Sequence, residues 1–312
     1  MASVLQLSDI QAQFDQGRSV NITTKAGNIT LSNPLIQASN SAGGSLTLSA
    51  RNQLVIEADV RLEKAGNDLR LIAGQDVWIR AGVANARRLV STNGGDLVVW
   101  SNSINSGSGA IRIDDFVDIA SGSGRVANSG ATGGGDIYLA GGNADSNNLP
   151  VGNAAGSIAF NPGVQLGTQR LADNVRIFSS GGNIKVSAES SRTAAITGFS
   201  GNRIESELGQ IEIFGERRGS ATGQTIRLNQ SGGDILGSNI ISKHVSNGAY
   251  QPAVKITAQT TSTGADWGLY IDEGGNTTAN SSNIIGYGGI QITSDSNTYQ
   301  HSALFRSVNV LA

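Results

Sequence analysis

Cysteine is absent from this chain of 312 residues, and proline, aromatic and charged residues are scarce. The lack of cysteine excludes disulfides, thiolate metal sites and thiol nucleophiles. Aromatic residues make up 5% of the chain and hydrophobic residues 38%, which is little for the two conventional cores that this length would allow. We therefore expect a thin core, to which short segments contribute small aliphatic side chains.

Charged residues make up 15% of the chain, and the formal net charge is −2. The chain therefore lacks the basic stripe that is typical of nucleic-acid-binding proteins, and we expect no nucleic-acid partner. No apolar run approaches the length of about 18 residues that crosses a bilayer, so we expect no membrane insertion. The first residues show no basic and apolar leader. We expect either a protein that stays inside the cell or a segment of a longer exported chain.

Glycine, in contrast, is abundant, with 42 residues. It recurs in a short motif in which two glycines precede Asp or Asn and then Ile or Leu. The copies lie at residues 94–97, 134–137, 181–184 and 232–235, with a variant at 43–46. A turn followed by a very short strand, repeated from end to end, is typical of a solenoid rather than a closed globule.

The spacing of matching strands predicts the kind of solenoid. Similar short strands begin at Leu46 and Leu69, at Val77 and Leu97, and at Ile137 and Ile158. These intervals indicate a unit of about 20–25 residues with several short strands, which fits one turn of a parallel β-helix. We predict an all-β, right-handed parallel β-helix of roughly 12–15 turns, or a rod about 60–70 Å long. An antiparallel sandwich is the alternative, but its Asn-Gly hairpin turns are represented clearly only at 247–248.

Residues 7–17 have the helical pattern, with Ser8 and Gln11 as a capping box and Gly17 placed to end the helix. Such a helix could cover one end of the solenoid, where unpaired strand edges would otherwise permit end-to-end self-association.

The chain thus divides into three parts, a capping segment, a solenoid and a C-terminal segment that either covers the last coil or pairs with another strand. Their boundaries are 1–19, 20–298 and 299–312. Stretches without strand alternation are predicted to be loops bulging from the corners, where specific contacts tend to lie. These are residues 121–135, 141–156, 187–206 and 257–267.

Outward-facing aromatic residues are the candidate binding surface. If Val77 and Ile79 face inward, Trp78 faces outward, and the same alternation places Trp100 and Tyr138 outside. Such residues stack against sugar rings or pack against another protein, unless a loop folds down over them.

An alignment of residues 74–80 with 94–100 refines this prediction. It places Arg80 beside Trp100 and Trp78 beside Val98 on neighbouring coils.

Acidic residues are the candidate catalytic groups, because parallel β-helices also carry enzymes that act on polysaccharides. The densest cluster is Asp114, Asp115 and Asp118, and a second contains Asp266, Asp272 and Glu273. Acid–base chemistry on sugars needs two carboxyl groups held across a bond. With two histidines, one methionine and no cysteine, we expect no metal or other cofactor.

Three segments resemble a known family. Residues 10–29, 94–101 and 109–116 are similar to the repetitive shaft of filamentous-haemagglutinin-like bacterial exoproteins, which are two-partner-secreted adhesins. The family's secretion domain, with its Asn-Pro-Asn-Leu motif, is missing here. The resemblance implies a non-enzymatic adhesive module of a secreted or cell-surface filament, whose partners are glycans or proteins on a host or neighbouring cell. A polysaccharide lyase or hydrolase that uses the first acidic cluster is the alternative.

Overall fold

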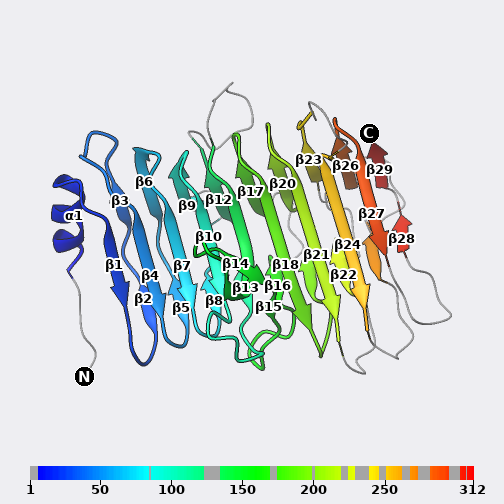
Figure 1. Ribbon diagram of the computed structural model, residues 1–312, viewed down its shortest axis with the longest axis horizontal. Coiled ribbons are helices and arrows are strands. Elements are labelled where there is room, and N and C mark those ends of the chain that lie inside the picture. The colour runs from blue at the N-terminus through cyan, green and yellow to red at the C-terminus, as the bar shows by residue number, and fades with distance from the viewer. Residues whose placement is uncertain are drawn as a thin grey trace.

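The computed structural model describes most of the chain. The described residues are 6–83, 86–122, 134–168, 174–198, 201–218, 224–228, 239–245, 251–261, 268–272, 282–294, 303–306 and 308–312. They form one helix and three long parallel sheets, which wind around a common core as a rod with the helix at one end (Figure 1). The predicted parallel β-helix is therefore confirmed.

Each coil contributes one strand to each sheet. The first sheet, sheet A, contains β1 (Val20–Thr23), β4 (Leu46–Ala50), β7 (Leu69–Ala73), β10 (Leu97–Ser101), β13 (Ile137–Ala144), β18 (Ile184–Ser190), β21 (Ile211–Arg217), β24 (Val254–Thr260) and β27 (Ile290–Ser294), with β14 (Pro150–Gly152) and β15 (Ala154–Ala155) beside them. Sheet B contains β2 (Ile29–Leu31), β5 (Leu54–Ile56), β8 (Val77–Ile79), β11 (Ile111–Ile113), β16 (Val164–Leu166), β19 (Ile196–Gly198), β22 (Ile226–Leu228), β25 (Leu269–Asp272) and β28 (Ala303–Arg306). Sheet C contains β3 (Leu35–Gln37), β6 (Val60–Ala65), β9 (Arg88–Asn93), β12 (Val117–Ser121), β17 (Val175–Ser179), β20 (Arg203–Ser206), β23 (Asn239–Ser242), β26 (Ser282–Gly286) and β29 (Val308–Leu311).

The number of coils differs from the prediction. Each sheet path has nine strands, so the described strands form nine coils and, at about 4.8 Å per coil, a rod of about 40 Å rather than about 60–70 Å. Most coils are longer than predicted because their corners take insertions. Leu46 pairs with Leu69, as the predicted spacing requires, but Ile137 pairs with Ile184, much farther along the chain.

Parts of two predicted loops are strands. Residues 187–206 run through the end of β18 and all of β19 and β20, and 257–260 belong to β24. Their outward residues are polar and some inward residues, such as Ala188, Gly198 and Ala258, are small, which hides the alternation. The repeat at 232–235 and most of residues 121–135 lie outside the described part of the chain.

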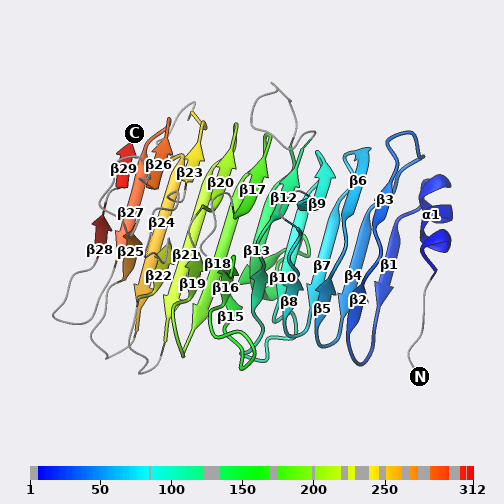
Figure 2. The same cartoon turned by 180° about the vertical axis from the view of Figure 1, so that it is seen from behind.

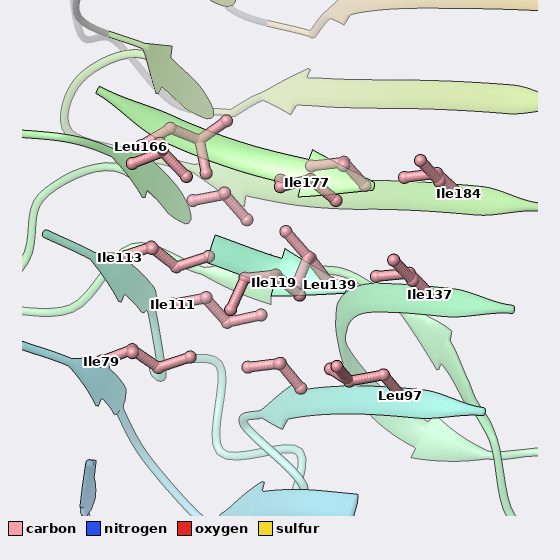
Figure 3. Packing of buried hydrophobic residues seen from close by; sticks show 14 of the residues in the cluster. Ile79, Leu97, Ile111, Ile113, Ile119, Ile137, Leu139, Leu166, Ile177 and Ile184 are labelled. Carbon is pink, nitrogen blue, oxygen red and sulfur yellow. The ribbon is translucent and has the colours of Figure 1, made fainter. Parts of the chain in front are cut away.

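The core is a set of aliphatic rows, one side chain above another along the rod. Leu97, Ile137 and Ile184 occupy equivalent positions of sheet A and are fully buried. Figure 3 shows these three side chains in a column, and Ile111 and Ile119 of the other two sheets belong to the same core. Because the inward residues of the inner coils are buried between neighbouring coils, the hydrophobic contribution to stability is shared along the rod.

Helix α1 (Leu7–Asp15) covers the N-terminal end of this core. Ile10 and Phe14 are buried against it, and Leu7 packs beside them. Gly17, with φ of 72°, ends the helix as predicted, and its amide donates to the Phe14 carbonyl. The predicted capping box was wrong, because the helix begins one residue before Ser8 and its N-cap, Gln6, makes no side-chain cap bond.

The corner between sheets C and A explains the second glycine of the motif. At the second glycine the backbones of successive coils lie in direct contact. A Cβ atom on Gly182 would lie 2.2 Å from the Gly135 carbonyl oxygen, and one on Gly209 would lie 2.0 Å from that of Gly182. None of these three glycines has a positive φ. Glycine is therefore required here because there is no room for a Cβ atom. The left-handed conformation that glycine permits is not the reason.

A column of buried hydroxyl groups supports the same corner. These residues stand in register at the ends of the sheet C strands and face inward, and they are Thr92, Ser121, Ser179, Ser206 and Ser242. Each donates to a carbonyl of a corner glycine in its own coil or the preceding one, as Ser206 does to Gly182 over 2.9 Å and Ser242 to Gly209 over 2.8 Å. The hydroxyls thus provide hydrogen-bond partners for the carbonyl groups of this corner.

The Asp or Asn of the motif links each coil to the next. Asp96 Oδ1 accepts from the amide of Asp136 over 2.9 Å, and Asp136 Oδ1 accepts from the amide of Asn183 over 2.7 Å. Asn183 continues the series by accepting from the amide of Gln210. These side chains form a ladder, here called the corner ladder, that fixes the register in which the following strands stack.

Substituting Gly182 with Ala should lower the free energy of unfolding by about 2–3 kcal/mol, because the new methyl group overlaps the backbone of the preceding coil. Denaturant unfolding measures the change. Gly66→Asn is the control, since Gly66 has open space and a φ of 77° that Asn tolerates, and it should cost less than about 1 kcal/mol. Equal losses at the two positions would contradict the stacking argument.

The corner ladder also predicts a pH-dependent effect. Burial, together with the carboxylates of Asp68 and Asp136, raises the pKa of Asp96 above its ordinary value. The stability associated with this shift is present below the unfolded pKa and is lost as pH rises through the folded pKa. Asp96→Asn keeps the acceptor oxygen, as Asn183 does, and should raise the melting temperature by about 1–2 °C at neutral pH. At about pH 3 the melting temperature should not change, and an equal rise at both pH values would exclude the charge as its cause.

Candidate functional site

The outer face of sheet B carries a cluster of aromatic and arginine side chains around Trp78. Trp78 stands in register with Val55 on one neighbouring strand and Arg112 on the other. The turn before β16 brings Phe160 to the indole, with ring centroids 5.5 Å apart in an edge-on arrangement. Trp78 is therefore outward-facing, as predicted, but partly buried.

Two guanidinium groups complete this cluster. Arg80 lies 4.5 Å and Arg112 4.9 Å from the centroid of the Trp78 ring, which is the geometry of cation–π contacts. Arg80 is exposed and forms an ion pair with Glu57, whereas Arg112 is held by Asp114. We call Trp78, Arg80, Arg112 and Phe160 the sheet B cluster.

The predicted contact between Arg80 and Trp100 was wrong. β8 belongs to sheet B and pairs with β5 and β11, whereas β10 belongs to sheet A and pairs with β7 and β13. The segment from Val77 to Leu97 therefore leads from one face of the rod to another and does not close a coil. Sequence similarity between the two segments reflects the same short strand used on different sheets.

Trp100 faces outward but is only 5% exposed. The segment from β13 to β14 folds back over it, and the Trp100 indole donates to the Gly142 carbonyl over 2.8 Å. Leu149 packs against the buried cluster of Ile72, Val98 and Trp100, while Arg70 donates to the Asn148 carbonyl. The low-complexity stretch 141–156 is thus a cover that buries a small second core on the outside of sheet A, and Trp100 is not an available binding residue.

Tyr138 lies at the border of this cover and is partly buried. Its hydroxyl donates to Asp136 over 3.0 Å. Burial, and secondly the Asp136 carboxylate, raise the pKa of Tyr138 above its ordinary value. Tyr138 is therefore partly covered and keeps a neutral hydroxyl.

The three acids of the first cluster each have a separate partner. Asp114 accepts from Arg112 Nε over 2.6 Å, Asp115 accepts from the Thr168 amide over 2.8 Å, and Asp118 accepts from Arg87 Nε over 2.7 Å. Each residue is at most 7% exposed. A sugar chain would have to displace these partners to reach the carboxylates.

The second acidic cluster cannot be described, because two of its three residues, Asp266 and Glu273, lie outside the described part of the chain. Within the described part of the chain, no three His, Asp or Glu side chains come together in a way that could hold a metal ion. No helix among the same residues is long and apolar enough to span a membrane.

Two residues of the sheet B cluster were not predicted from the sequence. Arg112 and Phe160 both lie far from Trp78 along the chain. Their proximity depends on insertions at the corners, which sequence periodicity does not count. The alternation of Ile111, Arg112 and Ile113 does indicate that Arg112 faces outward, but it does not indicate which residues lie beside it.

The fold and its faces define the class of this chain as a parallel β-helix repeat protein. In comparisons with known proteins, neither a protein-family model nor a curated protein matches the chain.

Proposed function

We propose that this chain is a non-enzymatic, adhesive module of a secreted or cell-surface filament, similar to the shaft of filamentous-haemagglutinin-like exoproteins. The observation that supports it best is the continuous aliphatic core through nine coils. A rod built in this way is rigid along its length and offers long outer faces, which suits the display of contact surfaces at a distance from their anchor.

The sheet B cluster is the proposed contact surface. The exposed Arg80 lies over the partly buried Trp78, so a cationic donor is held at a fixed position by an aromatic base. In the turn that supplies Phe160, Ile158 is 83% exposed. A guanidinium group beside apolar surface suits a glycan with acidic groups or an acidic protein surface on a host or neighbouring cell.

A polysaccharide lyase or hydrolase is the second candidate. Such an enzyme would use Asp114, Asp115 and Asp118. Each of these carboxylates has its own ion-pair or hydrogen-bond partner, which favours a structural role over a catalytic one. Turnover of acidic polysaccharides that is lost in the double variant Asp114→Asn, Asp115→Asn would favour the enzyme.

The adhesive role is tested by binding of the immobilised protein to glycan arrays and to fixed cells. Arg80→Ala with Ile158→Ser should reduce binding about tenfold, because the charged donor and the exposed apolar contact are both lost. Lys255→Ala is the matched control. Lys255 is also a cation paired with one carboxylate, Glu212, and its side chain is 44% exposed, but it lies on sheet A. Binding that falls equally in both variants, or in neither, would argue against this surface.

A further inference from the structure

The outer face of sheet B carries a single row of side chains along the rod. Strands β8, β11, β16, β19 and β22 each have three residues, of which the first and third are buried and the middle one is half-buried. Figure 2 shows the strands of this sheet following one another along the rod, from β2 beside α1 to β28. The outward residues of the third to the eighth coil stand in register, and we call them the sheet B row. They are Trp78, Arg112, Gln165, Thr197, Arg227 and Tyr270.

The two ends of the sheet B row have the same chemistry. At one end the guanidinium group of Arg112 lies 4.9 Å from the centroid of the Trp78 ring. At the other end the guanidinium group of Arg227 lies 5.7 Å from the centroid of the Tyr270 ring. The two positions between the arginines hold a carboxamide and a hydroxyl group, which both donate and accept hydrogen bonds. The row is therefore a polar track with an arginine and an aromatic ring at each end.

Both arginines of the row keep donor groups that the described residues do not use. Asp114 accepts from Nε of Arg112 over 2.6 Å, and no described residue accepts from the two terminal nitrogens of this guanidinium group. Arg227 forms no ion pair with a described carboxylate, and its Nε has no hydrogen-bond partner among the described residues. A guanidinium group binds an anionic group through two parallel hydrogen bonds. The row therefore has charge complementarity to a ligand with anionic groups at two separate points.

The distance between the two arginines determines the kind of ligand. Arg112 and Arg227 are three strand-to-strand steps apart, which is about 14 Å along the rod. A single sugar or a small anion cannot reach both of them. The row is also only one side chain wide, so it suits a thin, extended chain better than a folded protein surface. A linear glycan with acidic groups fits both conditions, and its hydroxyl groups match the carboxamide and hydroxyl of Gln165 and Thr197.

We propose that the sheet B row binds a linear acidic glycan that lies along the rod axis, and that Arg227 and Tyr270 form a second subsite on it. The inference rests on the proposed adhesive function, whose contact surface around Trp78 and Arg80 is the first subsite. Acidic groups of the glycan accept hydrogen bonds from Arg112 and Arg227. Once one subsite is occupied, the same chain reaches the other without a new encounter, so the site favours long oligosaccharides over short ones.

Calorimetric binding of size-graded oligosaccharides to the whole chain tests this inference. The probes are oligosaccharides of polygalacturonate, hyaluronan and chondroitin sulfate, beginning with the disaccharides. We expect at least one series to bind, with an affinity that rises about tenfold or more once the oligosaccharide spans both subsites. Arg227→Ala and Arg227→Gln, made separately, should each abolish this rise, because the second anionic group loses its donor. Binding of the disaccharide at the first subsite should stay unchanged in both variants.

Arg203→Ala is the matched control. Arg203 is also an outward-facing arginine, with a side chain that is 44% exposed, but it lies on sheet C in the coil next to that of Arg227. The rise in affinity with length should remain in this variant. Circular dichroism verifies that each variant retains its β-structure, and if one Arg227 variant misfolds the other still decides.

Four results would overturn the inference. They are no binding of any series, an affinity that does not rise with length, a rise that persists in both Arg227 variants, and a rise that is lost equally in Arg203→Ala. Polyglutamate that competes as well as a glycan of the same length would also overturn it, in favour of an acidic protein partner. Binding to cells or glycan arrays that needs Arg80 but not Arg227 would leave the adhesive role intact, whereas no binding in those assays would overturn that role as well.

Discussion

The stacking of one peptide backbone on another at the corner between sheets C and A is the constraint on which the rest of the structure depends. Gly135, Gly182 and Gly209 lie so close to the preceding coil that a Cβ atom has no room. The following Asp or Asn then accepts from the next coil's amide, and the following Ile or Leu begins the core row. The second glycine, the Asp or Asn and the aliphatic residue of the motif therefore each have a physical reason, and together they fix the register of sheet A.

This constraint explains how coils of unequal length stack. Insertions leave the corner unchanged, and some of them return to cover outer faces, as the segment after β13 does for Trp100 and the turn before β16 does for Trp78. The faces are therefore shaped by insertions, whereas the core is shaped by the motif. A rod with a uniform interior and variable faces is consistent with the proposed adhesive role.

The sequence predicted the fold class, the helix and the inward and outward alternation of strands such as β8 and β10, since each depends on neighbouring residues. It did not predict the coil length, because Val77 and Leu97 begin similar strands on different sheets. That error placed Arg80 beside Trp100. The burial of Trp100 and the meeting of Arg112 with Trp78 depend on contacts across one or more coils, which local alternation does not encode.

Cross-linking in this cysteine-free chain tests the central claim about register most directly. Tyr138 and Lys185 are partners on adjacent strands although they lie far apart along the chain. The shorter coil expected from the sequence would instead place Tyr138 beside Ala159. With both partners replaced by cysteine, a short thiol-specific cross-linker should join positions 138 and 185 efficiently. The pair 138 and 159 should remain unlinked. Efficient linking of 138 to 159, and none of 138 to 185, would contradict the account.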